Sequence, residues 1–143
     1  MLMEWMTEAK HTTRAPANAI WKLWSDVATW PDWDFGLESV TLDGPFEQGA
    51  RGRLKPKGGP RFRYTLTRVE TDVGFDDETR VPGAKIRFSH RIEDAPDGSR
   101  VVTHRAQITG ILTPLWVRIM GSDLVKELPA VVAELVTRAE AAS

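Results

Sequence analysis

The chain has 143 residues, of which 41% are hydrophobic and 27% charged, and its formal net charge is −1. This balance provides no general attraction to nucleic acid or to an anionic membrane. The absence of cysteine excludes disulfides, thiolate metal sites and cysteine nucleophiles. The length suits a single domain, residues 1–143, with a sizeable core.

The N-terminal segment, residues 1–6, is apolar but contains Glu4, lacks a basic region and is too short for a signal peptide. No apolar run approaches the roughly 20 residues that span a bilayer. We therefore expect a cytoplasmic protein that does not insert into a membrane. Residues 3–11 are expected to form the first strand.

Helical segments should follow at residues 15–33, where Pro16 suits a first helical turn and Pro31 imposes a break or a new short helix. This stretch holds four of the six tryptophans: Trp21, Trp24, Trp30 and Trp33. Tryptophan is large, and its indole N–H needs a partner when buried. We interpret the four as a lid over an apolar surface.

Residues 38–112 alternate as strands do, and short turns rich in Gly, Pro and Asp separate them, which indicates antiparallel neighbours. The segment after Pro114 predicts one long amphipathic helix. Its apolar positions are Leu115, Ile119, Leu124, Leu128, Val131, Val132, Leu135 and Val136. Only this helix is large enough to cover the sheet. The predicted class is α+β, a helix-grip fold. A curved antiparallel sheet of about six to seven strands would wrap round the long C-terminal helix, with two short helices after strand one.

Three stretches carry a resemblance to a known family: residues 15–33, residues 64–79 and residues 98–110 with the final helix. They resemble the SRPBCC superfamily, also called START-like or birch-pollen-allergen-like, and within it the polyketide cyclase/dehydrase-like group. The resemblance implies a cavity between sheet and helix for a hydrophobic small molecule. Its members include lipid carriers, aromatic polyketide cyclases and co-chaperone domains, and they share no single catalytic motif.

The turns also predict which side chains face this cavity. If Pro82-Gly83 is a two-residue turn, side-chain alternation places seven residues on one face: Phe75, Asp77, Thr79, Ile86, Phe88, His90 and Ile92. The neighbouring strands add Phe62, Tyr64 and Leu66 on one side and Val102, His104, Ala106 and Ile108 on the other. A slip of one residue would reverse the faces, so the register decides which of Asp76, Asp77 and Glu78 points inward.

His90 and His104 are then near neighbours on the concave surface, together with Tyr64, Asp77 and Thr79. Unpaired buried polar groups cost about 1–3 kcal/mol each, so these groups either bond to one another or serve a ligand. Structural hydrogen bonding, ligand orientation and acid–base catalysis all remain open at this stage. We expect no metal site, because histidines on facing strands have no diagnostic ligand spacing.

Other patterns are expected to carry no chemistry. The alternating cations from Arg51 to Lys57 lack a phosphate-loop motif and interleaved aromatic residues, which favours a solvated strand face. Ser25 and Ser122 have no identifiable base, so nucleophilic hydrolysis is not supported.

Two main functional hypotheses follow. The first is a binding protein for an apolar or aromatic ligand such as a lipid or polyketide, with His90, His104, Asp77 and Tyr64 at its polar end. The remaining expected ligand contacts are Phe75, Thr79, Phe88, Trp30, Trp33 and Trp116. The alternative is a cyclase- or dehydratase-like enzyme in which His90 or His104 moves a proton, without metal or cofactor.

A third hypothesis, a partner-binding module of the co-chaperone kind, would need an exposed apolar patch, which the sequence does not indicate. The expected partner is thus a hydrophobic small molecule and not nucleic acid, and the protein is a monomer or homodimer.

Overall fold

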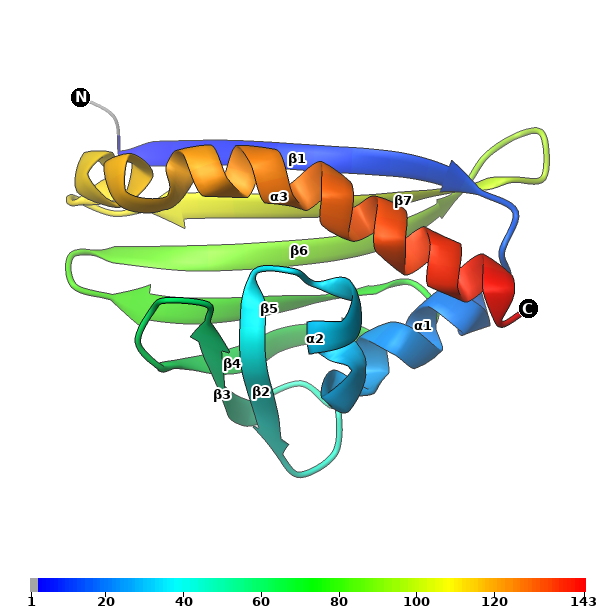
Figure 1. The fold of residues 1–143 in the computed structure, drawn as a ribbon, viewed down its shortest axis with the longest axis horizontal. Coiled ribbons are helices and arrows are strands. Elements are labelled where there is room, and N and C mark those ends of the chain that lie inside the picture. Colours follow the sequence, from blue (N-terminus) through cyan, green and yellow to red (C-terminus); the bar gives the residue numbers. More distant parts are fainter. Residues whose placement is uncertain (1–2) are drawn as a thin grey trace.

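The computed structural model describes residues 3–143, in which a seven-stranded antiparallel sheet is combined with a long C-terminal helix (Figure 1). The elements in chain order are β1 (Glu4–Thr13), α1 (Ala17–Ser25), the 3₁₀ turn η1 (Val27–Thr29), α2 (Trp30–Trp33), β2 (Leu37–Asp43), β3 (Arg51–Pro56), β4 (Phe62–Glu70), β5 (Gly74–Val81), β6 (Ala84–Asp94), β7 (Arg100–Thr109) and α3 (Thr113–Ala141). The strand order is β1-β7-β6-β5-β4-β3-β2, so the first strand pairs with the last. The helix-grip prediction is confirmed.

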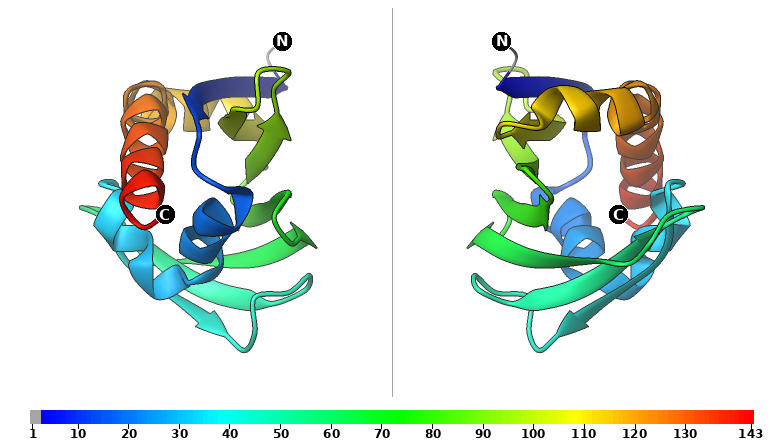
Figure 2. Two further views of the ribbon diagram at one scale, coloured as in Figure 1. Left: turned by 90° about the vertical axis from the view of Figure 1, so that its right-hand side faces the viewer. Right: turned by 90° about the vertical axis from the view of Figure 1, so that its left-hand side faces the viewer.

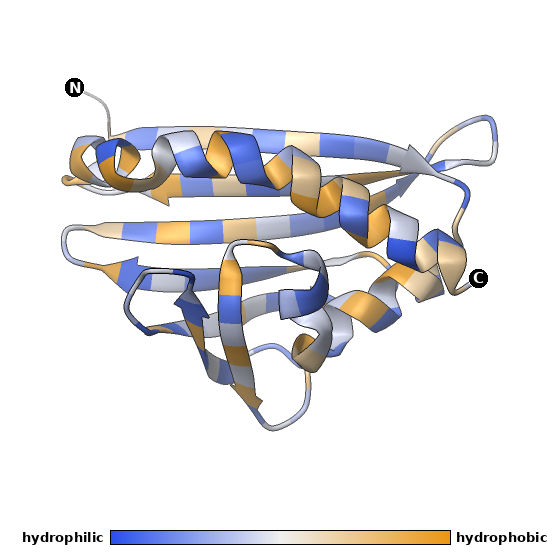
Figure 3. Ribbon diagram, viewed as in Figure 1, coloured by the Kyte–Doolittle hydropathy of each residue, from blue (hydrophilic) through white to orange (hydrophobic). Residues whose placement is uncertain are grey.

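The sheet curves strongly, and α3 and the short helices lie on its concave side (Figure 2). Alternating side chains explain this arrangement, because one face of each central strand is apolar and the other polar. The alternation is visible as bands of contrasting hydropathy along β6 (Figure 3). The C-terminal half of α3 closes the core with Val132, Leu135 and Val136, which are at most 1% exposed.

The register predicted from the Pro82-Gly83 turn is confirmed. Val81 pairs with Ala84, Asp77 with Phe88 and Phe75 with His90. His90 in turn pairs with His104 on β7. The inner face of β7 is buried as expected, since Val102, Ala106 and Ile108 have no exposed surface.

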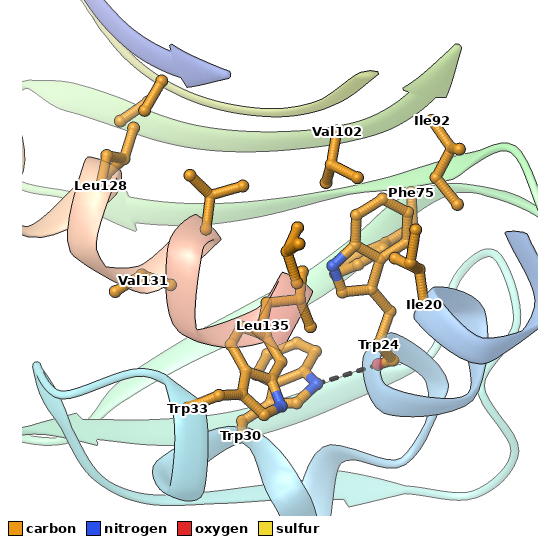
Figure 4. Close-up of a cluster of buried hydrophobic side chains, with 14 of the residues drawn as sticks. Ile20, Trp24, Trp30, Trp33, Phe75, Ile92, Val102, Leu128, Val131 and Leu135 are labelled. Carbon is orange, nitrogen blue, oxygen red and sulfur yellow. Dashed lines mark hydrogen bonds between the residues drawn. The ribbon is translucent and has the colours of Figure 1, made fainter. Parts of the chain in front are cut away.

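The lid interpretation is confirmed for three of the four tryptophans. Trp24 is fully buried and Trp30 and Trp33 are at most 5% exposed, whereas Trp21 is half-buried. The Trp30 indole N–H donates to the main-chain oxygen of Trp24 at 2.9 Å, which ties α2 to α1 (Figure 4). This bond satisfies the polar group that makes a tryptophan costly to bury.

The prediction for the start of α3 is wrong. Leu115 and Ile119 are 47% and 56% exposed rather than packed on the sheet. At roughly 100° per residue, Leu115 lies about 180° round the helix from Leu124, so the two cannot share a face. Trp116 and Met120 occupy the inward positions of these turns.

This end of α3 therefore carries exposed apolar side chains, which the sequence did not indicate. Ile111, just before the helix, is 71% exposed. None of the helices within residues 3–143 is long and apolar enough to span a membrane.

Candidate ligand cavity

A cavity of about 180 Å³ lies between the concave face of the sheet, α2 and α3. β5 and β6 contribute Asp77, Thr79, Ile86, Phe88 and His90, and β7 contributes His104 and Arg105. The rest of the wall is Trp30, Trp33, Asp34, Gly36, Leu37, Leu54, Pro56, Phe62, Trp116, Met120, Leu124, Glu127, Leu128 and Val131. The wall is therefore mainly apolar, with a few polar groups.

Eight of the predicted site residues are brought together on this wall. They are Trp30, Trp33, Asp77, Thr79, Phe88, His90, His104 and Trp116. The uncertainty about the acidic run is also resolved, because Asp77 faces the cavity. Asp76 lies on the opposite face, with Oδ1 2.8 Å from Nη1 of Arg91.

Tyr64 and Phe75, which were also predicted to contact a ligand, are not among the lining residues. The Tyr64 hydroxyl donates to the main-chain oxygen of Thr41 at 2.8 Å, so it is already satisfied by β2. Burial, together with the Asp77 and Asp43 charges, raises the pKa of Tyr64. Phe75 stacks on the His90 ring at 3.9 Å with an angle of 7° between the planes. Both residues support the wall from behind.

The two histidines have defined tautomers. Nδ1 of His90 lies 3.1 Å from the main-chain oxygen of Phe75, and because a carbonyl only accepts, this nitrogen carries the proton. Nε2 of His104 accepts the Trp24 indole N–H at 3.3 Å, so its proton lies on Nδ1. The neutral pair therefore offers one acceptor, Nε2 of His90, and one donor, Nδ1–H of His104. Their ring centres are 4.7 Å apart.

The surroundings keep both rings neutral. Burial lowers the pKa of His90 to about 3, and the Arg91 charge adds to this despite the opposing hydrogen bond to Phe75. Burial and the neighbouring His90 hold the pKa of His104 well below its usual value. Loss of water disfavours the charged imidazolium, which explains the direction of both shifts.

Asp77 is the least satisfied polar group of the wall. Its residue is 3% exposed, and its Oδ1 has no hydrogen-bond partner among residues 3–143. Burial, followed by the charges of Asp76, Asp34 and Glu78, raises the pKa of Asp77 well above its usual range. A carboxyl group in this setting favours its neutral form and can donate a hydrogen bond.

Two further carboxyl groups, which the sequence interpretation missed, stand nearer the surface. Asp34 and Glu127 are half-buried lining residues, and both lie close to Gly36. Asp34 Oδ1 accepts the Gly36 amide at 3.0 Å, and a Cβ atom at position 36 would lie 2.7 Å from Oε2 of Glu127. The sequence spacing could have revealed Glu127. It lies four residues before Val131 and seven after Met120, and residues at these spacings share one face of a helix.

We call Asp34, Gly36 and Glu127 the mouth of the cavity. The surroundings shift the pKa values of its two carboxyl groups. Burial and the Glu127 charge raise the pKa of Asp34 to about 6, although the Gly36 amide and Lys57 act in the opposite direction. Burial and the Asp123 charge raise the pKa of Glu127. No group of three or more His, Asp or Glu within residues 3–143 has an arrangement that could hold a metal ion.

A curved sheet gripping a long helix over a largely apolar cavity defines a START-like protein. A family model described as polyketide cyclase / dehydrase and lipid transport matches residues 5–140, and the chain belongs to this family. The family resemblance seen in the sequence is confirmed, and the fold is one that binds ligands. No curated protein matches the chain.

Solved structures agree on the fold. Norcoclaurine synthase from Thalictrum flavum is 14% identical with a TM-score of 0.71, over 93% of this chain and 91% of that one. A START superfamily protein from Mycobacterium smegmatis is 15% identical with a TM-score of 0.70, over 96% and 99%. A hypothetical protein from Helicobacter pylori is 9% identical with a TM-score of 0.76, over 94% and 87%. At these identities the likeness concerns architecture alone.

Proposed function

We propose that the protein binds a small apolar or aromatic molecule in the cavity, with the polar end of the ligand at Asp77, His90 and His104. The observation that carries the proposal is the unpartnered Oδ1 of Asp77, among residues 3–143, on an otherwise largely apolar wall. An unsatisfied buried polar atom costs about 1–3 kcal/mol. A ligand that hydrogen-bonds there recovers this free energy while it buries apolar surface.

The cavity volume limits the part of the ligand that is enclosed. At about 180 Å³ it slightly exceeds the engineered cavity of roughly 150 Å³ that holds benzene. One aromatic ring or a short branched chain therefore fits inside. A longer lipid or polyketide would extend past Asp34 and Glu127 into solvent.

Thermal unfolding with 2-phenylethanol as the probe tests this proposal. A ligand at 100 times its Kd stabilises the folded state by about 2.7 kcal/mol, so the melting temperature should rise by several degrees. Leu124→Phe places a larger side chain in the cavity and should abolish the rise. Val125→Phe changes the neighbouring residue, which is 51% exposed, and should retain it. No rise from 2-phenylethanol, and no small molecule retained by the purified protein in native mass spectrometry, would overturn the proposal.

A second candidate is acid–base catalysis on a ketone, as in a cyclase or dehydratase. The opposite tautomers of the histidines favour it. Nδ1–H of His104 and neutral Asp77 can donate to a carbonyl oxygen, while Nε2 of His90 can accept a proton from the adjacent carbon. This chemistry needs no group beyond the side chains of the wall.

The pKa of His90 places this candidate second. A base with a pKa of about 3 removes protons weakly near neutral pH, because base strength follows pKa. His90→Gln should abolish turnover of a poly-β-ketone model compound while its affinity changes less than about threefold. Turnover by the variant at the wild-type rate would exclude His90 as the base.

A further inference from the structure

The cavity mouth carries anionic groups with no closely paired cation in the described part of the chain. Asp34 and Glu127 both lie close to Gly36, and neither forms a salt bridge within residues 3–143. Arg105 also lines the cavity, but its guanidinium lies 2.9 Å from Oε2 of Glu8 on β1 and is engaged there. The wall therefore presents carboxyl groups that the described residues leave without a bonded countercharge.

Charged groups on the neighbouring elements shift the pKa values of Asp34 and Glu127. Glu127 of α3 raises the pKa of Asp34, and Lys57, which follows β3, lowers it without forming a salt bridge. Asp123, one turn earlier on α3, raises the pKa of Glu127. The charge of Asp34 also raises the pKa of the buried Asp77, so the mouth and the interior belong to one electrostatic site. Lys57 is thus a cation that opposes the negative charge of Asp34.

Asp77 provides an independent observation in the same cavity. Its Oδ1 is buried and unpartnered among residues 3–143, and its strand position points it to the concave face. A ligand group that donates an N–H to this oxygen would satisfy it, and the neighbouring carboxylates of the wall favour a donor that carries a positive charge.

Combining these observations, we propose that the ligand is an aromatic or branched apolar amine. Its ammonium group is the polar end that donates an N–H to Asp77, and the carboxylates of Asp34 and Glu127 on the same wall provide its countercharge. The inference rests on the proposed binding function and specifies its substrate class. One ring fills the volume of about 180 Å³. The ammonium group supplies the missing countercharge, and opposite charges interact more strongly at a partly desolvated mouth than in water.

Isothermal titration calorimetry with three probes of similar size tests the inference. At pH 7.5 and low salt, 2-phenylethylamine should bind about tenfold more tightly than neutral 2-phenylethanol, and the anion 3-phenylpropanoate should bind more weakly than either. Asp34→Asn and Glu127→Gln should each remove most of the preference for the amine without changing the affinity for 2-phenylethanol. The carboxamide introduced by Asp34→Asn keeps an oxygen for the Gly36 amide, so the local backbone is retained.

Two control variants separate local from general charge effects. Glu93→Gln removes a negative charge from an exposed position on the outer face of β6 and should leave the preference intact. Lys57→Gln removes the opposing cation and should increase the preference for the amine.

Proton release provides a second readout. Because the pKa of Asp34 is about 6, it is half-protonated at pH 6, and an ammonium group beside it should displace about half a proton. The heat of binding should then vary with the ionisation enthalpy of the buffer for the amine but not for 2-phenylethanol. Equal affinities for the two probes would overturn the amine inference alone, whereas no binding of any probe would overturn the proposed function as well.

Discussion

The inner end of the cavity is walled by His90 and His104 with Trp24 behind them, and its mouth is formed by Asp34, Gly36 and Glu127. The inner groups are stacked and bonded to one another. The Trp24 indole N–H donates to Nε2 of His104 at 3.3 Å. The His90 ring stacks on the Phe75 ring, with 3.9 Å between the ring centres. The mouth groups are half-buried and like-charged, and Asp34 is held by its bond to the Gly36 amide.

The contrast separates two roles within one cavity. The inner wall contributes stability, since its rings are neutral, buried and closely packed. The mouth costs stability, since it holds carboxylates in a partly desolvated place, with no cation bonded to them among residues 3–143. Substitutions should therefore act in opposite directions at the two ends.

The largest expected effect is at Trp24. Trp24→Ala should lower the free energy of unfolding by about 3–5 kcal/mol, because it removes a fully buried indole and leaves Nε2 of His104 without a donor. Trp21→Ala provides a matched control at a half-buried position and should cost clearly less. Urea denaturation measures both, and equal losses would show that the inner wall is not a special centre of stability.

The pH dependence of stability reports on the histidines. The pKa of His90 is about 3 in the folded protein and roughly 6.5 when unfolded, so the unfolded state binds more protons between these values. The contribution of the neutral His90 ring to stability is therefore complete above pH 6.5. Below this pH the free energy of unfolding should fall by about 1.4 kcal/mol per pH unit. As pH falls below 6, Asp34 increases the free energy of unfolding, which opposes the effect of His90. The useful quantity is therefore the difference in the free energy of unfolding between His90→Gln and wild type at each pH. This difference should change by about 2 kcal/mol between pH 6.5 and pH 5 in urea titrations. A constant difference would contradict the neutral buried ring.

Removing the mouth charge should stabilise the protein. The pKa of Asp34 is raised to about 6 in the folded protein from near 3.8 when unfolded, so the folded state binds more protons between these values. The stability that this proton binding provides is lost as pH rises from 3.8 through 6. Asp34→Asn should therefore raise the free energy of unfolding by about 1–2 kcal/mol at pH 8 and change it little at pH 3.5. Glu93→Gln should have no such dependence. A loss of stability at pH 8 would mean that the carboxylate supports the fold.

The smallest expected effect on stability is at Gly36. An added Cβ atom would lie 2.7 Å from Oε2 of Glu127, the flexible end of a side chain that can move away. Gly36→Ala should change the free energy of unfolding by less than about 0.5 kcal/mol. It should nevertheless weaken the binding of 2-phenylethylamine, measured by calorimetry, because it displaces the Glu127 carboxylate. A large loss of stability would indicate a rigid mouth.

The inner end of the cavity was largely predictable from the sequence, because strand alternation and a two-residue turn fix the register. Once Val81 pairs with Ala84, the inward positions of Asp77 and His90 follow from the twofold repeat of a strand. The pairing of His90 with His104 required only one further short turn.

The mouth was not predictable in the same way. Asp34 lies in the segment between α2 and β2, where no repeat fixes the direction of a side chain, and its position depends on how α2 packs. The start of α3 was misread because Leu115 and Leu124 were placed on one helical stripe, although their spacing puts them on opposite sides of a helix. The satisfied hydroxyl of Tyr64 depends on Thr41, and this contact between distant strands leaves no local signal.

The indole N–H signals of the tryptophans in a proton–nitrogen correlation spectrum test the central claim most directly, with 2-phenylethanol as the titrated probe. A ligand in the cavity should shift the signals of Trp30, Trp33 and Trp116, which line it, and that of Trp24 through His104. The Trp5 signal should stay in place, because Trp5 packs near Gly121 outside the cavity wall. Shifts confined to Trp5 and Trp21, or no shifts at all, would contradict a ligand site between sheet and helix.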